Sequence, residues 1–177
     1  MRIRSVFLIA VMTIIVICNA VAQKKPSVLT DEFTLTIDYN KTLEEMVAAG
    51  NYDVISDFIT FEHFPIPIDM IGRTIRAYPR LFYFSVNTKS NDAIKVMAQA
   101  GYRPATLAEL LALGAADPNA QTKFTIHALG SIWRSGSKKN PHFFAPCLCL
   151  FEGDRSLCCT DYDFTWPAGD RFLGIRK

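Results

Sequence analysis

Helical and extended patterns are segregated along this chain, which limits the folds it can adopt. Up to residue 114, apolar residues recur at helical spacing in three short segments that begin near residues 42, 90 and 106. Beyond that point come four runs typical of strands, divided by turns rich in Gly, Ser and Pro: residues 124–133, 143–151, 157–164 and 172–176. This separation predicts an α+β fold with two or three short helices first and antiparallel strands in the last third.

Local signals place the early elements. Thr42 with Glu45, and Thr106 with Glu109, have the Ser/Thr-x-x-Glu spacing of a capping box at a helix start. The middle helix is expected to open at Ser90 or Asn91 and to close at Gly101. Early strands are expected at residues 33–39, where apolar and polar residues alternate, within 54–64, and at 80–86.

The first 22 residues have the pattern of a secretory signal peptide. A short basic start at residues 1–4 precedes an apolar run at residues 6–18, shorter than the about 20 residues of a membrane span. Small residues at the positions that a signal peptidase recognises favour cleavage after Ala22. Residues 23–32 would then form a tether before a single domain at 33–177. We therefore expect a secreted or periplasmic protein, whose only membrane contact would be through an uncleaved signal.

Charge and motif content exclude several kinds of partner. Removing the leader takes away two of the 19 Lys and Arg residues and none of the 17 Asp and Glu residues, so the remaining chain is formally neutral. No basic stripe extends beyond Lys138-Lys139, and nucleic-acid binding is not expected. A Gly-rich phosphate loop and a helix-borne metal motif are both missing from the sequence, so we expect no cofactor and no metal.

Four cysteines lie within thirteen residues near the carboxyl end and are candidates for disulfides: Cys147, Cys149, Cys158 and Cys159. A two-residue turn at Gly153-Asp154 would place Cys149 opposite Cys158 and turn Cys159 to the other side of the strand. A disulfide between Cys149 and Cys158 is then one hypothesis, although direct opposition strains its geometry. Buried thiols, a zinc site near His142 and a redox cysteine are the alternatives; zinc is disfavoured because no Cys-x-x-Cys pair occurs.

Two segments resemble a known family. Gly101-Tyr102-Arg103-Pro104-Ala105-Thr106-Leu107-Ala108-Glu109-Leu110-Leu111-Ala112 resembles the G-[YF]-R-L-P-T-E-A-E-W-E-Y-A segment of the formylglycine-generating, sulfatase-modifying family, a branch of the C-type-lectin-like fold. The end, Arg171 to Arg176, is similar to the closing G-F-R strand of that family, and Trp133 and Trp166 match its core tryptophans. The sugar motifs Glu-Pro-Asn and Trp-Asn-Asp of calcium-dependent lectins do not occur, so calcium is not expected.

The resemblance implies a binding surface near the carboxyl end. Small lectin-like domains, among them the variable proteins of diversity-generating retroelements, carry contact residues on their last strands and loops, which here are residues 133–142 and 152–166. The ligand-binding candidates in these segments are Trp133, Arg134, His142, Asp161, Tyr162, Asp163 and Trp166. The simpler alternative for the last of these segments is alternation, with Tyr162, Phe164 and Trp166 on a core face and the two aspartates in solvent.

No catalytic residue is assigned from the sequence. His127 lies between apolar neighbours, where a histidine is usually structural, and aspartates two residues apart are a weak basis for a catalytic pair. The leading hypothesis is an exported, non-enzymatic domain that binds an unknown protein or small molecule through its last strands and loops. The alternatives are an oxidase of the formylglycine-generating type that uses the clustered cysteines, and a structural protein of the cell envelope.

Overall fold

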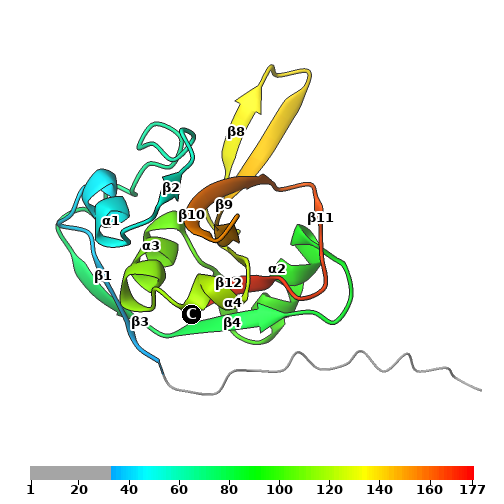
Figure 1. Cartoon of the computed structure of the whole chain (residues 1–177), viewed down its shortest axis with the longest axis horizontal. Helices are drawn as coiled ribbons and strands as arrows, with labels where there is room; N and C mark the ends of the chain where they lie inside the picture. Colours follow the sequence, from blue (N-terminus) through cyan, green and yellow to red (C-terminus); the bar gives the residue numbers. More distant parts are fainter. Residues whose placement is uncertain (1–32) are drawn as a thin grey trace, which may run out of the picture.

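The computed structural model describes residues 33–177, and the predicted signal peptide and tether lie outside them. Four helices and several sheets form an α+β fold in this part of the chain (Figure 1), which confirms the predicted fold class. The helices are α1 (Leu43–Ala49), α2 (Ser90–Gln99), α3 (Leu107–Ala116) and α4 (Ala120–Lys123). None of them combines the length and the apolar character that a membrane span requires. The sequence did not predict α4, because a single turn is too short to show a helical period.

Strands occur in both halves of the described chain. The early strands are β1 (Leu35–Asp38), β2 (Val54–Ile55), β3 (Thr74–Ala77), β4 (Pro79–Tyr83), β5 (Thr88–Lys89) and β6 (Tyr102–Pro104). The late strands are β7 (Ile126–His127), β8 (Trp133–Gly136), β9 (Pro141–Phe151), β10 (Asp154–Asp161), β11 (Thr165–Trp166) and β12 (Arg171–Arg176). The main sheet has the order β2-β10-β9-β7-β12-β4, with β6 paired to β12 and β8 to β9. Its pairings are antiparallel except β2 with β10 and β7 with β12.

The main sheet has a separate core on each face. Because side chains alternate along a strand, Leu148 of β9 packs in the first core and Ala145 of the same strand packs in the second. The first core joins the sheet to α1, α3 and the small sheet of β1 and β3. The second core joins it to α2 and the segment before β12, and its large side chains include Phe82, Met97, Trp166 and Phe172.

Both predicted capping boxes are present at the starts of α1 and α3. The Thr42 hydroxyl accepts a hydrogen bond from the Glu45 backbone N–H at 3.2 Å, and the Glu45 carboxylate accepts one from the Thr42 N–H at 2.8 Å. Thr106 and Glu109 make the same reciprocal pair. The predicted boundaries of α2 are confirmed too, since its C-cap, Ala100, directly precedes Gly101, which has a φ of 83°. That helix begins at Ser90, but the Ser90 side chain turns away from the helix end and bonds to residues near β11.

The turn between β9 and β10 differs from the predicted one. Phe151 pairs with Asp154, so the two turn residues are Glu152 and Gly153, with φ values of 52° and 98°. Two positive φ angles are the mark of the type I′ turn that suits the twist of a hairpin. The register therefore moves: Cys149 lies opposite Ser156, and Cys158 lies opposite Cys147. The predicted opposition of Cys149 and Cys158 is wrong.

Candidate functional site

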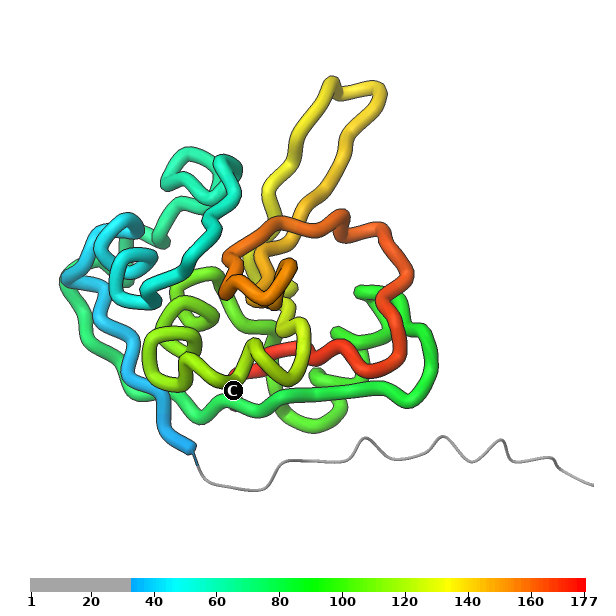
Figure 2. The backbone as a smooth tube through the Cα atoms, viewed as in Figure 1, coloured from blue at the N-terminus to red at the C-terminus, as the bar shows by residue number. Residues whose placement is uncertain are grey.

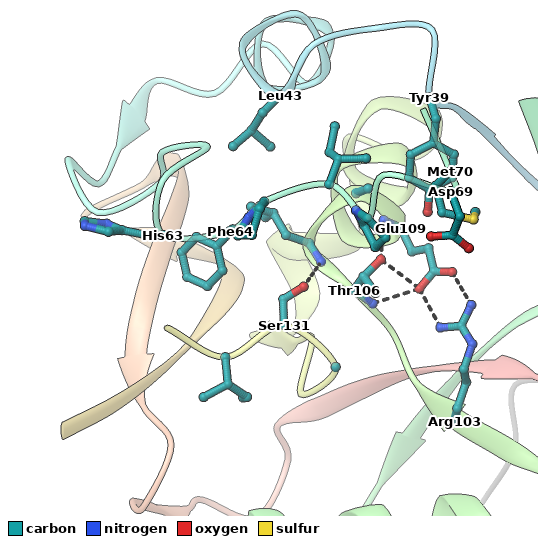
Figure 3. A pocket seen from close by; sticks show the side chains of 17 residues that line it. Tyr39, Leu43, His63, Phe64, Asp69, Met70, Arg103, Thr106, Glu109 and Ser131 are labelled. Atoms are coloured by element: carbon teal, nitrogen blue, oxygen red, sulfur yellow. Dashed lines mark hydrogen bonds and ion pairs between the residues drawn. The ribbon is translucent and has the colours of Figure 1, made fainter. Parts of the chain in front are cut away.

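A cleft of about 440 Å³ lies on the side of the first core. Its walls are the loop at residues 63–70, the first turn of α3 and the loop at residues 130–132, which leads into β8. Figure 3 shows Leu43, Phe64 and Met70 among the side chains around it, with Glu109, Thr106 and Arg103 grouped along one side. The lining is therefore mainly apolar, with its polar groups gathered in one part of the cleft.

The polar part of the cleft is built on Glu109. This residue is fully buried, and its carboxylate accepts two hydrogen bonds from the Arg103 guanidinium, at 2.5 and 2.9 Å. It also accepts from the backbone N–H of Thr106 at 2.7 Å and from the Thr106 hydroxyl at 3.0 Å. These bonds to Glu109 raise the pKa of the Arg103 guanidinium. Since a buried carboxylate must be paired, the cluster connects β6 to the start of α3 and leaves no net charge of its own.

The loop at residues 130–132 is placed by close backbone packing. The Gly130 N–H donates to the Ala105 carbonyl at 2.8 Å, and a Cβ at Gly130 would lie only 2.6 Å from that oxygen. Glycine is therefore required for this approach. This close approach places the Ser131 hydroxyl where it accepts a hydrogen bond, at 2.8 Å, from the Leu107 N–H in the first turn of α3. Figure 3 shows this bond along the lower wall of the cleft.

The side of the cleft that holds Glu109 and Arg103 also carries a carboxylate without a partner. Asp69 lines the cleft next to Met70, and its side chain is exposed (Figure 3). Over the described residues, no ion pair or hydrogen bond involves the Asp69 carboxylate. The other charged side chains of residues 56–72, Asp57 and Glu62, are acidic too. Because Arg103 already pairs with Glu109, Asp69 is the carboxylate of the cleft lining that has no partner in the described part of the chain.

A stack of aromatic rings adjoins the cleft. His63, which also lines the cleft, stacks on Trp133 of β8 with ring centroids 4.0 Å apart. Phe58 lies 4.9 Å from Trp133 on the same cluster, and Phe144 of β9 lies 5.2 Å from it. The hairpin of β8 and β9, drawn in yellow in Figure 2, projects from the body and carries two of these rings. His63 is held to the loop by a 2.9 Å bond between its Nδ1 and the Phe58 carbonyl.

The residues predicted to bind a ligand do not form one surface. Trp133 belongs to the aromatic stack beside the cleft, whereas Arg134 and His142 lie exposed further out on the same hairpin. Asp161 and Asp163 are exposed in the segment that follows β10, and the Asp161 carboxylate accepts the Asp163 N–H at 2.8 Å within its own turn. The structure thus brings only one of these five to the cleft.

The aromatic residues of that segment are divided between core and solvent. Trp166 is 1% exposed, and its indole N–H donates to the Ser90 hydroxyl at 2.8 Å, so its ring is not on the surface. Tyr162 is partly buried, and its hydroxyl donates to the Asn91 side chain at 3.3 Å. Phe164 is exposed, contrary to the simple alternation that would place all three rings in the core. A turn after Asp161 interrupts the strand and with it the alternation.

No family model, no curated protein and no solved structure matches this chain. The likeness of residues 101–112 and 171–176 to the formylglycine-generating family therefore stays a prediction. What the geometry adds is a physical role for two residues of the first segment. Arg103 and Glu109 pair with each other across a strand and a helix start.

The four cysteines of residues 33–177 are free thiols. The thiols of Cys149 and Cys158 lie on one face of the hairpin, with their sulfur atoms 3.7 Å apart. Cys159 faces the first core, and burial raises the pKa of its thiol to about 12. Among the described residues, no group of three or more His, Cys, Asp or Glu side chains is arranged to hold a metal ion. Raised thiol pKa values oppose the thiolate that an oxidase of the clustered-cysteine type would need.

The cleft could not be predicted from the sequence because its lining comes from four segments that are far apart in the chain, at residues 39–43, 63–70, 103–109 and 130–132. Residues 54–64 were expected to contain a strand, and they do at β2, but the rest of the segment has no strand and its last two residues, His63 and Phe64, line the cleft. Two signals were available there. Pro65 and Pro67 argue against a longer strand, and every charged side chain from residue 56 to 72 is acidic.

Proposed function

We propose that residues 33–177 form an exported ligand-binding domain that holds a small molecule in the cleft beside the aromatic stack. The cleft itself carries this proposal. Its volume of about 440 Å³ lies within the range of small-molecule sites, which are mostly apolar with a few convergent polar groups. The signal-peptide pattern of residues 1–22 supports export, and the lectin-like resemblance supports binding in place of catalysis.

The chemistry of the cleft favours an organic amine with an apolar body. Leu43, Phe64 and Met70 offer apolar contact, which favours the body of such a ligand. Asp69 offers a carboxylate that has no partner among residues 33–177, which favours a cation over an anion.

Two small aromatic probes of similar size and opposite charge test this proposal. In a titration followed by backbone NMR shifts, phenethylamine is expected to move the signals of residues 63–70 and 130–132, whereas phenylacetate should bind at least about tenfold more weakly. Asp69→Asn should remove most of this difference, because it removes the charge and keeps the shape. Asp163→Asn is the matched control, since that carboxylate is exposed and lies outside the cleft.

The outcomes separate the cleft from the surface predicted from the sequence. Shifts confined to residues 133–142 and 161–166, weakened by Asp163→Asn and not by Asp69→Asn, would transfer the site to the carboxyl-terminal surface. Equal binding of amine and acid would reject the charge argument. No shift with either probe, or with a wider set of neutral aromatic molecules, would reject the cleft as a binding site.

A further inference from the structure

We infer that Cys149 and Cys158 form a modification site for small-molecule disulfides, which oxidise the two thiols to a bond across the β9–β10 hairpin. This inference is independent of the cleft and goes beyond the proposed function. It begins with the register, because Cys149 and Cys158 are diagonal neighbours on the same face of the hairpin and not directly opposed.

The geometry selects this pair from the thiols on that face. The sulfur atoms of Cys149 and Cys158 are 3.7 Å apart, and a disulfide bond is about 2.05 Å long. Rotation of the two side chains therefore has to shorten the sulfur–sulfur distance only by the difference between these two values. Cys147, which lies directly opposite Cys158, is 2% exposed, and its sulfur contacts the Thr160 hydroxyl at 3.2 Å. Cys159 points to the other face and packs against the first core.

Accessibility points to the same pair. Cys149 and Cys158 are both partly exposed, so a small disulfide can reach either sulfur. Cys147 is enclosed by its own strand and its neighbours, and it faces His127 of β7 across the sheet. A thiol that a reagent cannot reach does not enter exchange, whatever its distance from a partner.

The reaction proceeds by two exchange steps. The thiolate of one cysteine attacks a sulfur atom of the small disulfide, forming a mixed disulfide and releasing one small thiol. The second cysteine, after losing its proton to solvent, attacks the protein sulfur of the mixed disulfide and releases the other small thiol. The two cysteines are oxidised and the small disulfide is reduced to two thiols, so no further oxidant is needed.

The site should react slowly and faster at higher pH. A hydrogen bond between the Cys149 and Cys147 thiols is the main cause that raises the pKa of Cys149 to about 11. The hydrogen bond with Cys149 and burial raise the pKa of Cys158 as well. Below those values the thiolate fraction grows about tenfold for each pH unit, and the exchange rate should follow it between about pH 7 and 9.

The test is oxidation of the full chain with oxidised glutathione, followed by alkylation and tryptic mapping. We expect a link between the peptide of residues 140–155 and the peptide of residues 156–171, with a mass lower by two hydrogen atoms. In Cys159→Ser and Cys147→Ser the link should persist, and in Cys149→Ser and Cys158→Ser it should disappear. Circular dichroism of each variant separates loss of the link from loss of the fold.

Three results would overturn the inference. The first is a bond between Cys147 and Cys158, the directly opposed pair, which would appear as a link that Cys147→Ser abolishes. The second is a stable mixed disulfide with glutathione on Cys149 or Cys158, which would mean that the diagonal geometry does not close. The third is full alkylation of Cys147, Cys149, Cys158 and Cys159 after prolonged exposure to the oxidant at about pH 9, where the rate is expected to be highest.

Discussion

The helices on the two faces of the main sheet are anchored by contacts that differ in their separation along the sequence. On the first face, α1 and α3 begin with capping boxes whose partners lie three residues apart, as in Thr106 and Glu109. On the second face, α2 has no side-chain cap, and Ser90 at its start bonds to Trp166 and to the Tyr162 carbonyl, more than 70 residues away. Local contacts can be recognised in a sequence, whereas contacts of this range cannot.

The largest effect is expected from a pair of variants that tests whether burial makes the capping box of α3 more stabilising than that of α1. Glu109→Ala removes a buried carboxylate that Arg103 and Thr106 bind, and we expect a loss of about 3 kcal/mol in the free energy of unfolding. Glu45→Ala removes the same position of the exposed capping box on α1 and should cost about 1 kcal/mol or less. Urea denaturation of both variants measures the difference. Equal losses would mean that burial and the Arg103 pair add nothing to the motif.

A smaller effect is expected on the second face. Ser90→Ala deprives the buried indole N–H of Trp166 of its acceptor and frees the Tyr162 carbonyl, which should cost about 2 kcal/mol. Urea denaturation followed by tryptophan fluorescence measures the change. Ser137→Ala is the control, because that hydroxyl is exposed and accepts a bond only within its own turn. A loss no greater than that of the control would show that packing alone positions α2.

The parts of the fold that the sequence predicted are those that depend on contacts between residues close together in the chain. The helix starts at Thr42 and Thr106, three of the four late strand segments and the α+β class were predicted, because each depends on residues close together in the chain. The strand expected at residues 124–133 is wrong, since a turn at residues 129–130 separates the short β7 from β8. The β9–β10 register was predicted wrongly by one turn position. The observed turn needs a positive φ at Glu152, which is unusual for a residue with a side chain and which no local pattern indicates.

The candidate site could be predicted only in small part. Trp133 was identified as a binding residue and lies beside the cleft, and Glu109 was identified as a helix-capping residue. Neither inference indicated that the two lie in the same region, because the loop at residues 63–70 and the loop at residues 130–132 are far apart in the sequence and meet only at the cleft. Trp166 was assigned to a surface, whereas its burial depends on a bond to Ser90 that no local pattern contains.

The smallest effect is expected at a buried hydroxyl group without a hydrogen-bond partner, on the face of the sheet that carries α1 and α3. Tyr52 packs against the first core, and its hydroxyl is buried with no hydrogen-bond partner among the described residues. Tyr52→Phe should therefore leave the free energy of unfolding unchanged at neutral pH or raise it by about 1 kcal/mol. Tyr78→Phe, at an exposed tyrosine, is the control and should change nothing.

The sign of this effect should depend on pH in a defined way. Burial raises the pKa of Tyr52 from its ordinary value of 10.0 to about 12, so the folded state keeps a proton that the unfolded state has already lost. The stability of the wild-type chain should then fall as pH rises from about 10 through about 12. Tyr52→Phe lacks this loss, so its advantage over the wild type should grow across that range in urea denaturation. An advantage that is constant with pH would mean that the hydroxyl reaches water in the folded chain, and that the first face is looser around Tyr52 than its packing against the core implies.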